Sequence, residues 1–353
     1  MLVGHNTVRS LVLGDAKRAP TAAELATMRD HIRLALEQGC CGFSSGLIYR
    51  PGRYSDTEEV VELAKVAGEF DALYTTHMRN EGDKLLDAVD EALLIGKESG
   101  SHLHISHHKA AGKANWGKVS QSLMKVEEAL VNGQAVTLDV YPYTAGSGRM
   151  IEYFNLDNPN EELARTIRIA SCPANRLYEG RMLVDIAEAE GKTMPEMVRS
   201  VLLAPEGDKT LCIQFVISEE DVETNIKQRD MMIGSDGIPD LKGRPHPRLF
   251  GTFPRVLGHY VRERKLIGLA EAIRRMTSLP ARIFGMKERG RVAEGYHADL
   301  VLFDSGLIAD QATYDQPMLP PVGIKTVVVN GEIALSDGAA TGAGSGRMLR
   351  FRN

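Results

Sequence analysis

The first half of the chain repeats one pattern, in which a short apolar run ends in polar residues and is followed by an amphipathic segment with helical spacing. The polar ends of these runs fall at Ser45, His77, His107 and Tyr141, at intervals of 32, 30 and 34 residues. A (β/α)8 barrel has about 31 residues per strand–helix unit. The pattern therefore predicts a parallel sheet covered by helices. A doubly wound open sheet would show the same period, but no Gly-x-Gly-x-x-Gly turn favours it.

Two capping boxes mark expected helix starts within this pattern. Thr21-x-x-Glu24 opens a predicted helix that stops at Gly39, and Ser55-x-x-Glu58 opens the next one. The same periodicity predicts further strands and helices, at 73–77, 85–95, 102–107, 123–130 and 135–141.

The alternation of predicted strands and helices is interrupted after residue 141. Residues 146–225 contain one expected helix, at about 183–203, and a proline-containing stretch before the next strand at 231–236. We interpret 146–225 as an insertion over the carboxyl-terminal face of the barrel, where insertions commonly form lids. The barrel with this lid would span residues 1–289.

From residue 290 the chain has an all-β pattern. Apolar runs at 298–303 and 326–329 precede Asn330-Gly331, which turns into a further apolar run. Asn-Gly between such runs is a strong hairpin signal. Residues 290–353 are therefore expected to form a small β domain beside the barrel.

Composition narrows the classes of partner and compartment. The net charge is −5 and the lysines and arginines are scattered, so a nucleic-acid partner is not expected. No apolar stretch is long enough to span a bilayer and the first residues do not resemble a signal peptide, which favours a cytoplasmic protein without a membrane partner. The four cysteines are interpreted as reduced and mostly buried.

His77 and His107 end neighbouring predicted strands, and the carboxyl ends of barrel strands converge on one mouth. Imidazole pairs suit zinc. Either histidine alone could be structural, but their equivalent positions favour a metal site. Asp236 ends the last barrel strand, in Gly234-Ser235-Asp236-Gly237, where it could bind metal or transfer protons. The alternative is a turn aspartate before Gly237.

Basic side chains and tyrosines are expected near the same strand ends, around this predicted site. Arginine and lysine suit a substrate carboxylate, arginine through bidentate geometry. Taken singly, each of these residues could instead be a solvated charge or a packed aromatic. The candidates are Tyr49, Arg79, Lys109, Tyr141 and Arg248.

In combination and order, the motifs resemble the N-acyl-D-amino-acid deacylases (D-aminoacylases) of the amidohydrolase superfamily, over nearly the whole chain. The matching stretches are Ser45-Gly46-Leu47-Ile48-Tyr49, Thr76-His77-Met78-Arg79-Asn80-Glu81-Gly82, Ile105-Ser106-His107-His108-Lys109, Asp139-Val140-Tyr141-Pro142-Tyr143, Gly234-Ser235-Asp236-Gly237, Pro245-His246-Pro247-Arg248, Gly251-Thr252-Phe253-Pro254-Arg255, Met276-Thr277-Ser278 and Ala298-Asp299-Leu300-Val301.

The resemblance implies that His77 and His107 hold zinc and that Asp236 activates the water and transfers its proton. It implies that Lys109, Tyr141 and Arg248 bind the substrate carboxylate and that Tyr49 is an active-site tyrosine. The implied reaction is hydrolysis of an N-acyl-D-amino acid to a carboxylate and a D-amino acid. The alternatives are an inactive remnant or acyl-amino-acid binding protein, and a cyclic-amide hydrolase of the same superfamily.

The chain departs from the family pattern at its start and in its insertion. The family's first barrel strands, with a His-x-His pair and a zinc-binding cysteine, have no counterpart here. The expected fold is therefore α/β, an incomplete (β/α)8 TIM-type barrel of strands three to eight with a small C-terminal β-sandwich portion. Two exposed sheet edges would follow, and a second copy or another partner could cover the gap between them. The segment 147–172 is shorter than the family's lid, so the resemblance does not define the acyl specificity.

Overall fold

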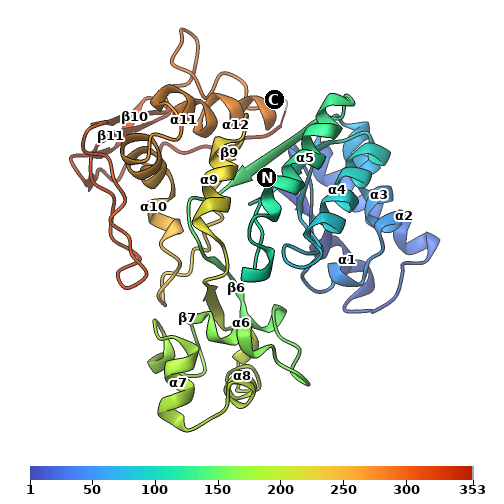
Figure 1. Ribbon diagram of the computed structural model, residues 1–353. Coiled ribbons are helices and arrows are strands. Elements are labelled where there is room, and N and C mark those ends of the chain that lie inside the picture. Colours follow the sequence, from blue (N-terminus) through green and yellow to red (C-terminus); the bar gives the residue numbers. More distant parts are fainter. Residues whose placement is uncertain (352–353) are drawn as a thin grey trace.

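The computed structural model describes residues 1–351 and has a parallel sheet with helices on its outer face (Figure 1). The sheet has six strands in the order β1-β2-β3-β4-β5-β9, with β1 and β9 at its edges. These strands are β1 (Leu2–Gly4), β2 (Gly42–Gly46), β3 (Leu73–His77), β4 (His102–Ile105), β5 (Val136–Val140) and β9 (Met232–Ile233). The expected α/β fold with a parallel sheet is confirmed.

Helices alternate with these strands along the chain and cover the sheet. They are α1 (His5–Leu13), α2 (Ala22–Glu37), α3 (Thr57–Glu69), α4 (Leu85–Ser99), α5 (Lys118–Val131), α9 (Glu219–Lys227), α10 (Arg248–Arg255), α11 (Leu269–Met276) and α12 (Ser278–Ile283). Helix α1 follows β1 directly and was not anticipated, because its nine residues include Asn6 and Thr7, which are weak helix formers.

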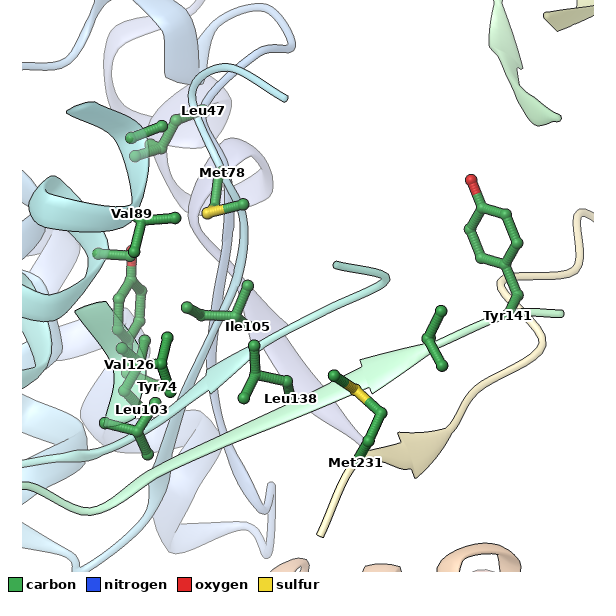
Figure 2. Packing of buried hydrophobic residues seen from close by; sticks show 14 of the residues in the cluster. Leu47, Tyr74, Met78, Val89, Leu103, Ile105, Val126, Leu138, Tyr141 and Met231 are labelled. Atoms are coloured by element: carbon green, nitrogen blue, oxygen red, sulfur yellow. The ribbon is translucent and has the colours of Figure 1, made fainter. Parts of the chain in front are cut away.

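Apolar side chains between the sheet and the helices form the main core. Figure 2 shows members of this cluster, such as Tyr74, Leu103 and Leu138, along successive strands, and Tyr141 apart from them at the end of β5. The hydroxyl end of Tyr141 lies away from the apolar cluster, toward polar residues beyond the strands. The core thus fixes the strands whose ends carry the candidate chemistry.

The helix-start predictions were right for α2 and one residue early for α3. Thr21 and Glu24 form the expected reciprocal capping box. The cap of α3 is Asp56, whose side chain accepts a hydrogen bond from the backbone N–H of Glu59. Ser55 instead donates its hydroxyl proton to the carbonyl oxygen of Gly52, at 2.6 Å. Aspartate and serine are about equally good caps, so the sequence did not distinguish these adjacent positions.

Residues 146–214 form a separate antiparallel sheet with its own hydrophobic core, and this part projects away from the rest of the molecule (Figure 1). Its elements are β6 (Gly146–Arg149), α6 (Glu161–Arg165), β7 (Ile167–Ser171), α7 (Leu183–Glu190), α8 (Met194–Leu202) and β8 (Leu211–Gln214). The prediction of one helix at 183–203 was wrong. Gly191 ends α7 with a φ of 63°, and Thr193 begins α8 with a capping box.

The C-terminal strands form a four-stranded antiparallel sheet in the order β10-β11-β12-β13. They are β10 (Leu300–Phe303), β11 (Ile324–Val329), β12 (Glu332–Ser336) and β13 (Ala339–Ala340). Asn330 and Gly331 connect β11 to β12 with φ values of 47° and 87°, as a type I′ hairpin requires. The predicted hairpin is confirmed.

Two further properties of the chain concern its cysteines and its helices. All four cysteines are free. Cys172 and Cys212 are buried, whereas Cys40 and Cys41 are partly exposed. Among residues 1–351, no helix combines the length and the apolar character that crossing a membrane requires.

Candidate active site

His77 and His107 lie against each other at the ends of neighbouring parallel strands. His77 is the last residue of β3 and His107 follows β4, so the parallel pairing of these strands brings both side chains to one edge of the sheet. Nδ1 of His77 is 2.9 Å from Nε2 of His107. The structure therefore brings together the two histidines predicted from the strand ends.

Glu81 lies beside both imidazoles. One carboxylate oxygen is 3.0 Å from Nδ1 of His107, and the other is 3.7 Å from Nε2 of His77. His77, Glu81 and His107 each offer a ligand atom, and these atoms lie within 4.8 Å of one another. Asp236 is not a member of this group. The histidines are thus joined by a carboxylate from the loop after β3.

Lys109 neutralises Glu81 at the centre of the site. Its ammonium group donates to a carboxylate oxygen of Glu81 and, at 2.8 Å, to the carbonyl oxygen of His107. The same nitrogen is 2.8 Å from Nδ1 of His107. Lys109 is buried, and its hydrogen bonds join the predicted metal residues. Its predicted contact with a substrate carboxylate remains a proposal.

Asp139 holds the segment that carries His107. One of its carboxylate oxygens accepts the backbone N–H of His107 at 2.7 Å, and the other is 2.8 Å from Nε2 of His104. The segment is constrained at this point, because His107 has a φ of 41°, which is uncommon for a residue other than glycine. His104 is buried, and its contact with Asp139 helps to hold that carboxylate in place.

Arg248, Asp236 and Tyr141 form a second group in the same region. The guanidinium of Arg248 pairs with the carboxylate of Asp236 at 2.9 Å and lies over the Tyr141 ring, 4.5 Å from its centroid. Nε and Nη1 of Arg248 and the hydroxyl of Tyr141 are buried and have no hydrogen-bond partner in the described chain. Such buried donors are costly unless something binds them.

A cavity of about 380 Å³ is lined by members of both groups, but His107 and Arg248 are not among its wall residues. Its wall includes five residues predicted from the sequence and several from the insertion. The predicted residues are Tyr49, His77, Lys109, Tyr141 and Asp236. The insertion contributes Gly146, Ser147, Gly148, Arg149, Glu152, Tyr153, Leu211 and Gln214. Arg79 is not part of the wall, and its guanidinium pairs with Glu91 at 2.8 Å.

Burial and the nearby charges set the protonation of the site. Burial lowers the pKa of His77 to about 3, so its imidazole is neutral and can act as a ligand. Burial opposes ionisation of Glu81, but Lys109 and the two histidines hold the pKa of this carboxyl well below its usual range. Burial also raises the pKa of Tyr141, so its hydroxyl keeps its proton and remains a donor.

The sequence did not reveal the roles of Glu81, Asp139 and Tyr153. Glu81 follows His77 by four residues in the loop after β3, where no periodicity indicates the direction of a side chain. Asp139 is the one charged residue within strand β5, and this was the signal that could have identified it. Tyr153 belongs to the insertion, whose path the sequence did not predict.

Comparison with known proteins identifies the family. The profile of the Amidohydrolase family matches residues 2–335, which is nearly the whole chain. The chain belongs to the amidohydrolase family. Members of this family are hydrolases, and the chain is accordingly an enzyme of the class that cleaves amide C–N bonds outside peptides.

Several members of the amidohydrolase family with known activities are similar to this chain. A D-aminoacylase from Alcaligenes xylosoxydans xylosoxydans is 40% identical over 99% of this chain and 69% of its own length. The crystal structure of a D-aminoacylase has a TM-score of 0.90 at 40% identity, covering 99% of this chain and 71% of the other.

A further solved structure carries a bound metal. The N-acyl-D-glutamate deacylase from Bordetella bronchiseptica, in complex with zinc and a phosphonate inhibitor that mimics the tetrahedral intermediate, has a TM-score of 0.88 at 41% identity. The match covers 96% of this chain and 70% of that one. The residues of the present amidohydrolase suit such an ion. Nε2 of His77 is buried without a hydrogen-bond partner in residues 1–351, and imidazole with carboxylate is a usual donor set for zinc.

Proposed function

We propose that this amidohydrolase uses zinc to hydrolyse N-acyl-D-amino acids to a carboxylate and a free D-amino acid. The observation that carries the proposal is a histidine–carboxylate group near buried donors that lack partners, with His77, Glu81 and Tyr141 lining one cavity. The histidine–carboxylate group suits a metal ion, and the buried donors suit a carboxylate. An N-acyl amino acid has its amide one carbon away from its carboxylate, so it could contact both. The names of the similar proteins support the D configuration.

The substrate carboxylate would bind to Arg248 and Tyr141. Nε and Nη1 of Arg248 are buried without partners on different edges of the guanidinium, and either can donate a hydrogen bond to a carboxylate. The Tyr141 hydroxyl would add a third donor, and Lys109 a nearby positive charge. Asp236 pairs with Nη2 of the same guanidinium and so fixes its orientation.

His77 and His107 would hold the zinc ion, with Asp236 as a third ligand or as the group that transfers protons. Zinc, when bound, would polarise the acyl oxygen and lower the pKa of a water molecule. Asp236 would take a proton from the attacking water and deliver it to the amide nitrogen. The water oxygen forms a bond to the acyl carbon, the C–N bond breaks, and the amine leaves with that proton.

The remaining cavity residues would surround the acyl group and the amino-acid side chain. Tyr49 contacts His77, with its hydroxyl 3.4 Å from Nδ1, and so lies close to the proposed metal. Tyr153 and Glu152 belong to the insertion, and both line the same cavity. We propose that the insertion, within 146–225, acts as a lid on a barrel that spans residues 1–289.

A panel of substrates tests the reaction and the carboxylate recognition together. We expect the zinc-loaded protein to release D-methionine from N-acetyl-D-methionine at least about 100-fold faster than it hydrolyses the L enantiomer. N-acetyl-D-methioninamide lacks the carboxylate and should lose about 10-fold or more in kcat/KM, since a hydrogen bond to a charged group contributes about 1.5–3 kcal/mol. Equal rates on both enantiomers, or hydrolysis of hydantoin or dihydrouracil alone, would contradict the proposal.

A further inference from the structure

His246 lies behind Arg248, in the loop between β9 and α10. Its side chain is buried, with an exposed fraction of 3%, and that of Arg248 is 1% exposed. Nδ1 of His246 is 3.0 Å from the backbone nitrogen of Arg248, which donates to it. The first residue of α10 is therefore tied to this ring, and that residue carries the guanidinium at the proposed carboxylate site.

The opposite nitrogen of the ring is bound to a different part of the chain. Nε2 of His246 donates to the carbonyl oxygen of Ala145 at 3.0 Å. Ala145 directly precedes β6, where the insertion begins. Because Nδ1 accepts and Nε2 donates, the ring has one fixed neutral tautomer. Burial and the charge of Arg248 lower the pKa of His246 well below its ordinary value, which keeps the ring in this form.

Two tyrosines hold the ring in place from its sides. Tyr143 and Tyr314 both meet it edge to face, each with a centroid distance of 5.2 Å. Tyr314 comes from the loop between β10 and β11 and also packs against Phe215, which follows β8. Three segments that are distant in sequence thus meet at His246, namely 143–145, its own loop and the loop that carries Tyr314.

We infer that His246 is a positioning residue that holds Arg248 where its guanidinium can bind a ligand carboxylate. The inference rests on the proposed function, because that function assigns the carboxylate to Arg248. His246 is not a catalytic residue in this account. Both of its nitrogens are bound to main-chain atoms, and Nε2 also lies 3.4 Å from the hydroxyl of Tyr314.

Two substitutions separate positioning from simple packing. In His246→Asn the side-chain amide lies near the place of Nδ1 and can still accept the Arg248 N–H. In His246→Gln the amide reaches the place of Nε2 and can donate to Ala145, but the acceptor for Arg248 is lost. Both variants remove the ring, so both lose similar packing against Tyr143 and Tyr314.

The measurement is binding of N-acetyl-D-methionine to the metal-stripped full chain by calorimetry, with N-acetyl-D-methioninamide as the ligand without a carboxylate. We expect His246→Gln to weaken binding of the acid about 10-fold or more and His246→Asn to change it less than about 3-fold. Neither should alter binding of the amide. Thermal unfolding of both variants reports the loss of packing, which should be similar in the two.

Equal weakening in both variants, or weakening that is the same for acid and amide, would overturn the inference, because the ring would then contribute packing alone. Unchanged binding of the acid in His246→Gln would also overturn it. The proposed function fails by a different result, namely a zinc-loaded wild type that binds the acid and does not hydrolyse it.

Discussion

At the scale of single residues, the site depends on buried polar atoms that receive partners only when ligands bind. Nε2 of His77, the hydroxyl of Tyr141 and two nitrogens of Arg248 are all buried and unpartnered within residues 1–351. An unpaired buried donor costs about 1–3 kcal/mol, which a bound ion or carboxylate would recover. Glu81 is the exception among these polar groups, because it is already paired and its carboxylate lies beside both histidines.

Glu81→Gln tests this supporting role of the carboxylate. We expect the substitution to weaken zinc binding about 10- to 100-fold, because carboxylates hydrogen-bonded to metal-binding histidines typically contribute that much to affinity. The measurement is competition for zinc between the protein and a coloured chelator. Glu91→Gln is the matched control, since Glu91 is a similarly buried carboxylate paired with Arg79 outside the cavity. An affinity in Glu81→Gln equal to that of the control would refute the role.

The histidines were predictable from the sequence and Glu81 was not, for a physical reason. Apolar runs that end in His77 and His107 place both side chains at strand ends, and parallel strands align those ends. Glu81 lies in a loop, whose direction depends on tertiary contacts such as its pairing with Lys109. The position of Asp236 at the cavity was predicted, whereas its pairing with Arg248 was not.

At the scale of elements, a buried ion-pair cluster fixes helix α1 against α3. The carboxylate of Glu59 in α3 pairs with Arg9 and, at 2.9 Å, with Nε2 of His5, both from α1. All three side chains are buried. Removing one partner of a buried pair leaves an uncompensated charge, so this cluster should govern how firmly α1 is attached.

Glu59→Gln should lower the free energy of unfolding by about 3–5 kcal/mol at pH 7. Burial opposes ionisation of Glu59, but hydrogen bonds from His5 and Arg9 outweigh it and lower the pKa of this carboxyl from 4.5. A lowered folded-state pKa stabilises the fold above the unfolded pKa, and this stability is lost as the pH falls through the folded value. The deficit of Glu59→Gln should therefore be full above about pH 5 and shrink below about pH 4.5.

Urea unfolding of both proteins between pH 3.5 and pH 7 measures this difference. The control is Glu62→Gln on the same helix, whose partly exposed pairs with Lys65 and Arg29 should each contribute less than about 1 kcal/mol at any pH. A deficit in Glu59→Gln that does not change with pH, or one as small as that of the control, would show that the cluster does not stabilise the ionised carboxylate.

The sequence predicted the elements well where periodicity and local signals agreed. Strands β2 to β5, helix α2 and the Asn330-Gly331 hairpin are examples. It failed where a short polar signal interrupts an apolar run. Residues 183–203 have apolar positions on both sides of a short polar stretch, in which Gly191 and the Thr193 capping box divide them into two helices. Helix α1 was missed because it is short and follows β1 with no connecting loop.

At the scale of the whole molecule, parallel strands gather distant residues at one mouth. Tyr49 and Asp236 are far apart in the sequence, yet both line the cavity at the carboxyl ends of the strands. The insertion, which projects from the sheet in Figure 1, adds Tyr153 and its neighbours to the same wall. The repeat of strands and helices predicted the mouth. This repeat could not predict which residues of the insertion line the cavity, because the packing of a separate hydrophobic core determines their positions.

The most direct test of the central claim is to remove bound metal from the chain and measure the release of D-methionine from N-acetyl-D-methionine as zinc is added back. Metal catalysis of this kind is worth several kcal/mol, so the stripped protein should be at least about 100-fold slower. The rate should rise with zinc and reach a plateau, and His77→Ala should abolish the rise. Full activity without metal, or release of L-methionine alone from the L substrate, would contradict the account.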